Sequence, residues 1–476
     1  MEDEAAVASS DALGTQAVEL LQRLLRLDTV NPPGNEEPAQ ELLAETLTEA
    51  GFECELLAAE PGRPNLVARL RGEREGPTLC LLGHVDTVPA DPAEWSFDPW
   101  SGDVVDGEVR GRGAQDMKDQ VAAEVAAAAA LGRDGWRPPS GELLVVATAD
   151  EEMGAGAGAQ WLCREHPEKV RADYVLNEGG GVAFTVEGRR FYSLCVGEKG
   201  VFRFLLRSHG RAGHASVPAL GDNALLKLAP LLERLREQPP LEPTPEAIEL
   251  LSAITRRDLG ATPDGLSETV EWLRRLAPEL AAYVVEPMLR VTLVPTQASA
   301  SRKENVVPSR AEVLVDCRVP PGMSEADVRA RAAAVLGLPE LATDAATPGV
   351  EDRSMADTGA PGVADEGATG IEIEFAEHVV GNRSPAHTAL AERIESWLAE
   401  EDPGAVLVPI VMAGFSDSHW FREAFDSATV YGFCPQRELS LPAAAPLVHG
   451  ADERAAVADI DLGARFYRDI AQAVLG

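Results

Sequence analysis

Three carboxylates in a row, Asp150, Glu151 and Glu152, follow directly on the apolar run LLVVATA of residues 143–149. Acids at the exit of a buried strand are costly unless their charge is compensated. The triplet could be a solvated strand end in a chain with 78 acidic residues, and considered alone it favours that interpretation, because acids are mostly exposed. Alternatively, neighbouring side chains at a strand end diverge, so one carboxylate could bind a metal while another moves a proton.

A histidine and an acid mark a second strand exit. His84 and Asp86 follow the apolar run 78–82, and α/β folds place ligand sites at such ends. If the chain stays extended, side chains two apart share one face, so Asp86 could accept the imidazole N–H and aim the other ring nitrogen at a metal. The alternative is a histidine that is exposed or only hydrogen-bonded.

Three further residues have the chemistry of metal ligands, and each has a structural alternative. Asp116 precedes an alanine-rich helix at 121–131, where it could stabilise the helix N-terminus or bridge two ions with its two oxygens. Glu178 follows a strand-like run and precedes three glycines that allow close backbone approach. His449 lies in a Pro/Ala-rich loop, where a histidine usually has no special role.

The composition indicates a soluble globular protein of about two or three domains. The 476 residues are 45% hydrophobic and 25% charged, with a formal charge of -36 that opposes nucleic acid and anionic membranes as partners. The six cysteines are far apart, which predicts reduced thiols in a cytoplasmic protein. The sequence has neither a signal-peptide pattern nor an apolar tract of membrane-spanning length, so we expect neither export nor a membrane span.

Helices alternate with strands in the first part of the chain, which predicts an α/β fold with a mostly parallel, covered sheet. The pattern rests on strand-like runs at 65–70, 78–83 and 143–149 and on helical spacing at 17–27, 40–50 and 121–131.

Beyond Gly197 the pattern changes to a β-α-β-β-α-β layer. Its expected strands are 201–208, 290–295, 311–319 and 371–380, and its helices are 223–236 and 324–336. The segment 242–286 looks inserted into this layer, and 342–367 has hardly any large apolar residue, which predicts an exposed loop. We therefore expect a discontinuous domain of residues 1–196 and 382–476 and an inserted α+β domain of residues 197–381, with the insert and the loop in the latter.

One short motif favours a different class of protein. Gly154-x-Gly156-x-x-Ala159 fits a dinucleotide-binding fingerprint, with a strand before it and a helical stretch after it. Against a nucleotide-dependent oxidoreductase, the acids at 150–152 stand between strand and glycines, where they would repel a pyrophosphate.

Taken together and in order, the motifs GHVDTVP, GRGAQDMK, ADEEMGAGAG, NEGG and LVHGADE resemble the M20 metallopeptidases. That family includes aminoacylases, glutamate carboxypeptidases, succinyl-diaminopimelate desuccinylases and dipeptidases. The resemblance covers nearly the whole chain. It implies a zinc-peptidase catalytic domain with an inserted ferredoxin-like domain that serves as lid or dimerisation domain.

The resemblance also implies a role for each motif residue. Two zinc ions would share Asp116, the first completed by His84 and Glu178 and the second by Glu152 and His449. Co²⁺ or Mn²⁺ could also occupy such ligands. Asp86 would be the hydrogen-bond partner of His84, and Glu151 the general base that takes a proton from a metal-bridged water and returns it to the leaving amine.

Further residues match positions that contact substrate in the family. His214, in the run GRAGHAS, would stabilise the oxyanion, often in the partner subunit's site, unless it is a plain surface histidine. Asn305 and Arg318 would bind the substrate's carboxylate, although Asn305 could instead sit in a turn and Arg318 could pair with Asp316. Gly414 and Ser416, in GFSD, resemble a small-residue loop that meets substrate.

Asp119-Gln120 departs from the family's usual glycines. We expect it to place a charge beside the site entrance, which affects substrate choice.

The resemblance implies a di-metal amidohydrolase that cleaves a peptide or N-acyl amide with a free carboxylate on the product side. Carboxypeptidase, dipeptidase and aminoacylase activities remain open at this point. A non-catalytic binding protein on the same fold and the nucleotide-dependent oxidoreductase are the alternatives. The expected partners are a small-molecule or short-peptide substrate and, through the lid domain, a second copy of the chain.

Overall fold

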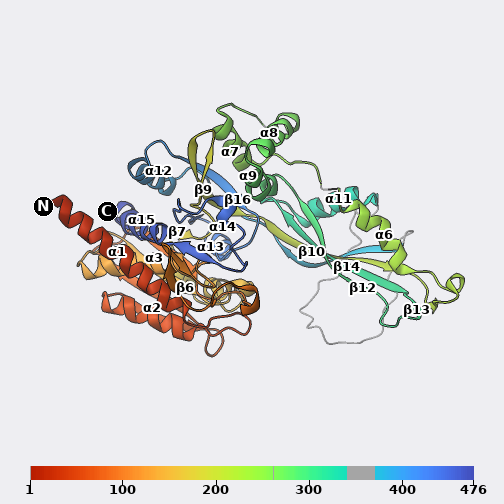
Figure 1. Ribbon diagram of the computed structural model, residues 1–476, viewed down its shortest axis with the longest axis horizontal. Helices are drawn as coiled ribbons and strands as arrows, with labels where there is room; N and C mark the ends of the chain where they lie inside the picture. The colour runs from red at the N-terminus through yellow and green to blue at the C-terminus, as the bar shows by residue number, and fades with distance from the viewer. Residues whose placement is uncertain (1, 238, 261, 340–369) are drawn as a thin grey trace. The chain divides into compact units, whose positions relative to one another are not determined.

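A computed structural model describes residues 2–237, 239–260, 262–339 and 370–476. The chain forms two compact units (Figure 1). Unit 1 comprises residues 1–198, 243–288 and 382–476, and unit 2 comprises residues 199–242 and 289–381. The expected exposed loop at 342–367 lies outside the described residues.

A mixed sheet organises unit 1, in the order β1-β2-β6-β3-β7-β17-β9-β16, with β8 paired to β9. The central strands β6, β3, β7 and β17 are parallel, and antiparallel pairs flank them. The strands are β1 (Glu53–Ala58), β2 (Pro64–Arg71), β3 (Thr78–His84), β6 (Glu142–Thr148), β7 (Tyr174–Asn177), β8 (Ala183–Val186), β9 (Arg189–Glu198), β16 (Val406–Met412) and β17 (Thr429–Gly432). A small separate sheet joins β4 (Asp103–Val105), β5 (Glu108–Arg110) and β18 (Arg454–Ala456).

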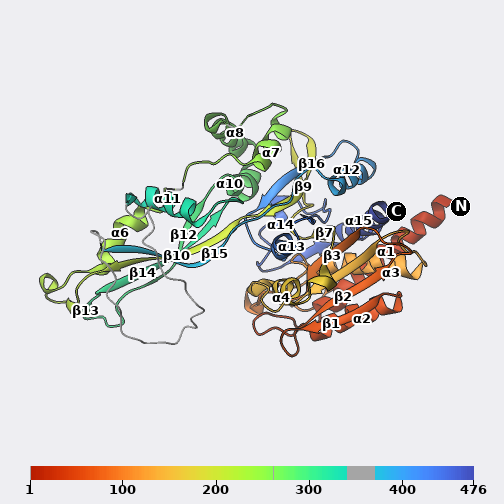
Figure 2. The same ribbon diagram turned by 180° about the vertical axis from the view of Figure 1, so that it is seen from behind.

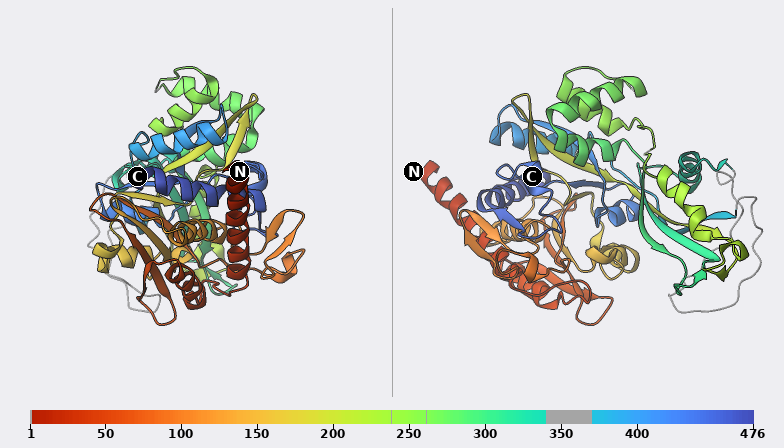
Figure 3. Two further views of the ribbon diagram at one scale, coloured as in Figure 1. Left: turned by 90° about the vertical axis from the view of Figure 1, so that its left-hand side faces the viewer. Right: turned by 45° about the vertical axis from the view of Figure 1, so that its right-hand side comes forward.

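Helices cover both faces of this sheet, so its central strands are apolar throughout. In β3, Leu79 and Leu81 enter one core, whereas Cys80 and Leu82 enter the other. One face is covered by α1 (Glu2–Leu25), α2 (Glu37–Glu49), α3 (Lys118–Arg133) and α15 (Val457–Leu475), of which α1, α3 and α15 pack together (Figures 1 and 3). The other face is covered by α4 (Ala159–Glu165) and α13 (Ser418–Ala424), which pack on each other (Figure 2).

The helical segment around 242–286 belongs to unit 1, although the sequence analysis assigned it to the inserted domain. It consists of α7 (Pro245–Thr255), α8 (Pro263–Leu276), α9 (Pro278–Leu280), a π-helical turn (Ala281–Val285) and α10 (Glu286–Met288). The physical reason is that α7 and α10 pack on β16, and that Glu246 of α7 pairs with Arg383 at 3.0 Å. This segment therefore extends the sheet domain.

Unit 2 follows the β-α-β-β-α-β order. Its antiparallel sheet has the order β12-β14-β10-β15, and alternate residues of β10 and β14 are buried against the helices. The elements in chain order are β10 (Gly200–His209), α6 (Ala224–Arg234), β12 (Thr292–Ser299), β14 (Arg310–Val319), α11 (Glu325–Leu336) and β15 (Ile371–Val379). A two-stranded ribbon of β11 (Gly213–His214) and β13 (Val306–Val307) extends from it.

Candidate metal centre

The carboxyl ends of β3, β6 and β7 bring most of the predicted ligands to one edge of the sheet. His84 is the last residue of β3 and pairs with Thr148, the last residue of β6. Glu151 and Glu152 follow β6 in a short 3-10 turn, and Glu178 directly follows β7. Because β6, β3 and β7 are parallel neighbours, these side chains emerge together.

The carboxylate of Asp116 lies between two histidines. Its Oδ1 is 3.1 Å from Nε2 of His84, and its Oδ2 is 3.1 Å from Nε2 of His449. Asp116 precedes α3, and His449 comes from the loop before β18, so the sequence separation between them is large. One carboxylate that shares its oxygens between two imidazoles is the arrangement expected of a bridging ligand.

Two acids lie beside the two histidines that flank Asp116. Oε2 of Glu152 lies 3.2 Å from Nε2 of His449, and Oε1 of Glu178 lies 3.9 Å from Nε2 of His84. Candidate donor atoms from His84, Asp116 and Glu152 lie within 4.8 Å of one another, as do those from His84, Glu151 and Glu178.

This donor set fits divalent cations. Oε1 of Glu152 is buried and has no hydrogen-bond partner in the part of the chain that the structure describes. Imidazole nitrogens and carboxylate oxygens together suit Zn²⁺, and they also accept Co²⁺ or Mn²⁺. A cation would thus satisfy an oxygen that the protein leaves unpaired.

The electrostatics of the cluster reflect crowded acids around two histidines. Burial raises the pKa of Glu151 and of Glu178 well above the ordinary value. Hydrogen bonds to Asp116 and Glu152 raise the pKa of His449 to about 10. Although burial opposes it, hydrogen bonds to His449 and His84 hold the pKa of Asp116 well below its usual range. The cluster therefore stabilises positive charge at its centre.

Asp86 holds both His84 and the acidic turn. Its side chain is fully buried, its backbone oxygen lies 3.0 Å from Nδ1 of His84, and its Oδ1 lies 3.5 Å from the same nitrogen. The backbone N–H groups of Glu151 and Glu152 donate to its carboxylate at 3.2 Å. Asp86 thus orients the imidazole so that Nε2 faces Asp116.

Glu453 positions the Asp116 loop, a role that sequence reasoning missed. Its buried carboxylate accepts hydrogen bonds from the backbone N–H groups of Gly113, Gln115 and Asp116 at 2.7–3.0 Å, and from Nη1 of Arg112 at 2.5 Å. Four donors converge on one carboxylate, which fixes the loop that carries Asp116. The only signal in the sequence is its position four residues after His449.

The loop around Gly414 and Ser416 contains a buried serine that bonds an acid of β9 and, beside it, a buried aspartate. Ser416 is buried, and its hydroxyl donates to Glu198 at 2.5 Å, whereas Gly414 is exposed. Beside them, Asp417 accepts a hydrogen bond from Thr148 at 2.5 Å, and burial raises the pKa of Asp417 to about 7. Asp417 is therefore a further acid near the end of β6 that sequence analysis did not single out.

The sequence predicts that Asp119 places a charge beside the site entrance, and this prediction is wrong. It lies in the first turn of α3, is 5% exposed, and accepts a hydrogen bond from Gln436 at 3.4 Å. Burial, with the nearby charges of Glu453 and Asp116 adding to it, raises the pKa of Asp119 to about 8. The side chain is thus protonated at neutral pH.

The glycine motif at 154–159 offers no free anion site. The backbone N–H of Ala157 donates to Oδ2 of Asp150 at 2.9 Å, and that of Ala155 donates to the backbone oxygen of Asp150. The helix that follows, α4, has only seven residues. The backbone N–H groups of Ala155 and Ala157, which a pyrophosphate would need, therefore already donate to Asp150.

The remaining predicted residues lie in unit 2. His214 is exposed in β11, with Nδ1 2.7 Å from the hydroxyl of Ser216, and the backbone oxygen of Asn305 accepts the N–H of Ala215 at 3.0 Å. Arg318 lies near the end of β14, and its Nε donates to Asp316 at 3.0 Å. His214 and Asn305 are therefore neighbours in one ribbon, whereas Arg318 lies apart from them.

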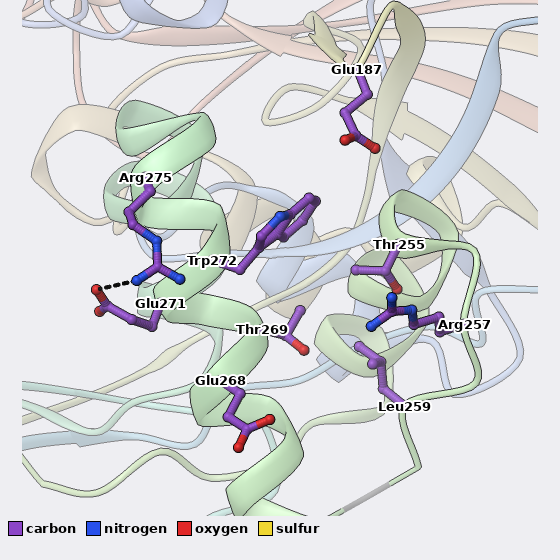
Figure 4. Close-up of a pocket in the computed structure, with 9 residues that line it drawn as sticks. All are labelled: Glu187, Thr255, Arg257, Leu259, Glu268, Thr269, Glu271, Trp272 and Arg275. Carbon is purple, nitrogen blue, oxygen red and sulfur yellow. Dashed lines mark ion pairs between the residues drawn. The ribbon is translucent and has the colours of Figure 1, made fainter.

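A cavity of about 580 Å³ lies elsewhere in unit 1. It is lined by residues of α7, of α8, of the loop after α7 and of the β8–β9 turn, and Figure 4 shows the Trp272 ring directed from α8 toward the side of Glu187 and Thr255. None of the predicted site residues lines it.

Comparison with known proteins identifies the family. Residues 80–473 match the model of Peptidase family M20/M25/M40. The chain belongs to this family. An M20 assignment agrees with the paired ligand sets around Asp116 and disfavours the nucleotide-dependent oxidoreductase.

Relatives of this M20 chain include the succinyl-diaminopimelate desuccinylase of Rhodospirillum centenum. The two are 35% identical over 253 residues, a stretch that covers 51% of this chain and 62% of the relative. The match therefore spans less than two thirds of the relative's length.

Two solved structures share the fold. An M20 family metallo-carboxypeptidase from Sulfolobus solfataricus has a TM-score of 0.68 at 18% identity, covering 97% of this chain and 99% of that one. Human carnosine dipeptidase 1 has a TM-score of 0.67 at 16% identity, covering 99% and 98%. The expected α/β fold with a mostly parallel central sheet is confirmed. Within the described residues, no helix combines the length and apolar character needed to cross a bilayer.

Proposed function

We propose that this chain is a di-metal amidohydrolase that cleaves a peptide or N-acyl amide bond and leaves a free carboxylate on the product. The observation that carries the proposal is the shared carboxylate of Asp116, 3.1 Å from both His84 and His449. His84, Asp116 and Glu178 would hold one ion, and His449, Asp116 and Glu152 the other. Two such ions polarise a carbonyl and lower the pKa of an attacking water.

Glu151 is proposed as the general base. It precedes Glu152 in the same turn, and its Oε2 lies 3.9 Å from Nε2 of His84, as far from this nitrogen as Oε1 of Glu178, so it lies at the cluster. From there the carboxylate accepts a proton from the attacking water and returns it to the leaving amine. The backbone N–H of Glu151 is held by Asp86, which limits the movement of the base.

The product carboxylate would be bound by residues of unit 2. Arg318 would offer its guanidinium, whose Nε and Nη2 donate to Asp316 in this structure, and His214 with Asn305 would offer a second group of polar side chains. Arg310 is the first residue of β14, and Arg318 is the last but one. The ribbon that carries His214 adjoins the Arg310 end of this strand. Eight residues of strand separate the two groups by roughly 25 Å. A small substrate cannot contact both groups of one chain, which supports a homodimer in which His214 acts on the partner's substrate.

The substrate is proposed to be a short peptide or an N-acyl amino acid. Because a relative is a succinyl-diaminopimelate desuccinylase, N-succinyl amino acids are the first class to assay. A panel of N-acyl amino acids and dipeptides, with Zn²⁺, Co²⁺ or Mn²⁺ added to metal-free protein, would identify the activity. Hydrolysis of none of them, or a chain that binds no metal, would overturn the proposal.

Glu151→Gln separates the base from a ligand. The variant should bind two ions like the wild type but hydrolyse nothing, because the amide cannot take a proton. Loss of an ion in this variant would instead make Glu151 a ligand beside His84 and Glu178, which their mutual proximity allows. A turnover rate equal to the wild type would contradict both roles. The complete ligand set and the intact acid disfavour a non-catalytic binding protein.

A further inference from the structure

Asp150 adopts a left-handed backbone conformation immediately before the two functional acids. Its φ is 66°, a value that a residue other than glycine keeps only when its surroundings enforce it. Its buried carboxylate supplies that constraint, because Oδ2 accepts the N–H of Ala157 at 2.9 Å, which ties the two ends of the turn together. The direction in which Glu151 and Glu152 leave β6 therefore depends on how Asp150 is held.

Asn31 links Asp150 to the partner of His84. Its buried Nδ2 donates to Oδ2 of Asp86 at 2.9 Å and to Oδ1 of Asp150 at 3.0 Å. Asp86 in turn accepts the N–H groups of the acidic turn. One amide thus joins the carboxylates that support the turn from its two sides.

Arg63 pairs its positive charge with the carboxylates of Asp150 and Glu36. Its Nη2 lies 2.9 Å from Oδ1 of Asp150 and 2.6 Å from Oε1 of Glu36, whose side chain is fully buried. The chain makes room for the guanidinium at Gly34, where a Cβ would lie 2.2 Å from Nε of Arg63. A buried arginine between two buried acids cannot be removed without leaving their charges uncompensated.

We propose that Arg63, anchored by Glu36, is a positioning residue for the Asp150–Glu152 turn. Through Asp150 it sets the backbone from which Glu151 and Glu152 project, although it touches neither of them. This inference rests on the proposed function, and it adds that ion affinity and turnover depend on a residue outside the ligand set. Partners that only orient a metal ligand commonly change affinity or activity about 10–100-fold when they are removed.

The test compares Arg63→Met with Arg69→Met. Arg69 lies on β2 and forms a similar part-buried ion pair with Glu142, but its hydrogen bonds go to Glu142 and to the backbone oxygen of Lys169 rather than to the acidic turn. Both variants lose a buried charge pair, so both should lose stability. Titration of metal-free protein with Co²⁺ measures ion affinity, and steady-state kinetics measure kcat and KM.

We expect Arg63→Met to bind at least one ion about 10–100-fold more weakly and to lose kcat by a similar factor, with KM within about threefold. Arg69→Met should match the wild type in all three. Equal ion affinities and equal kcat in the two variants would overturn the inference.

If Arg63→Met does not fold, Arg63→Lys decides the question against Arg69→Lys. A lysine keeps the charge but offers one nitrogen in place of a planar fork, so a smaller loss in the same direction is expected. No difference between the two lysine variants would overturn the inference. A wild type that binds no Co²⁺ would instead refute the proposed function.

Discussion

Replacing Asp119 by asparagine should make the protein less sensitive to alkaline pH. The carboxyl group is buried in the first turn of α3, and its Oδ1 has no hydrogen-bond partner among the described residues. Asparagine has nearly the same shape as a protonated aspartate. Its oxygen can still accept the hydrogen bond that Nε2 of Gln436 donates to Oδ2.

The magnitude follows from the pKa of Asp119, which burial raises from 3.8 to about 8. Between these values the folded state keeps a proton that the unfolded chain has released, so the free energy of unfolding falls as pH rises. At about 1.4 kcal/mol for each pH unit, Asp119 removes up to about 6 kcal/mol by pH 8. Asparagine carries no proton and removes this contribution.

Urea unfolding of metal-free protein at pH 5 and pH 8.5 measures the effect. All seven tryptophans lie in unit 1, so their fluorescence reports on the unit that contains Asp119. The variant should exceed the wild type by about 1.5–2 kcal/mol at pH 5 and by about 5–6 kcal/mol at pH 8.5. Asp134→Asn, at the exposed end of the same helix, is the control and should change stability by less than about 0.5 kcal/mol. A stability difference that does not grow with pH would show that Asp119 is ionised in the fold and would refute the reasoning.

Three further predictions concern the same unit. Glu453→Gln replaces one acceptor oxygen with an NH2 group that faces two donors, so it should lower the free energy of unfolding by about 3 kcal/mol and weaken Co²⁺ binding at Asp116; wild-type values in both titrations would contradict this. Gly158→Ala places a Cβ 1.9 Å from the backbone oxygen of Ala149 and should cost more than about 2 kcal/mol in urea unfolding, whereas Gly156→Ala, with 3.7 Å of room, should cost little. Chelation should lower the thermal midpoint of the tryptophan signal and added Zn²⁺ should restore it, because the ions bind only the folded cluster; an unchanged midpoint would count against a metal centre.

Local patterns in the sequence predicted the framework of the site. The apolar runs before His84 and Glu151 indicate buried strands, and parallel strands bring their carboxyl ends to one edge. Both inferences can be made from residues that are neighbours in the sequence. The positions of Asp116 and His449 needed the family resemblance, because nothing local relates a helix start to a loop more than three hundred residues later.

The supporting residues could not be read from the sequence, because their partners are distant in the chain. Asp150 had no expected role, and its partner Arg63 lies directly before β2, far from it in the sequence. Asp119 was expected at the site entrance because it follows Asp116 closely, yet the first turn of α3 directs it toward Gln436. The insert at 242–286 was misplaced for a similar reason, since its packing on β16 is a long-range contact.

The position of β17 has a consequence for synthesis on the ribosome. This short strand lies between β7 and β9, pairing with Asn177 on one side and with Cys195 on the other through Gly432. Among the residues that the structure describes, no strand pairing joins the β1–β7 half of the sheet to the β8–β9 hairpin until Gly432 has been made. The strands of unit 2 are complete by Val379. We therefore expect the nascent chain to complete the strands of unit 2 first, and to leave the sheet that carries His84 and Glu178 open until β17 has been made.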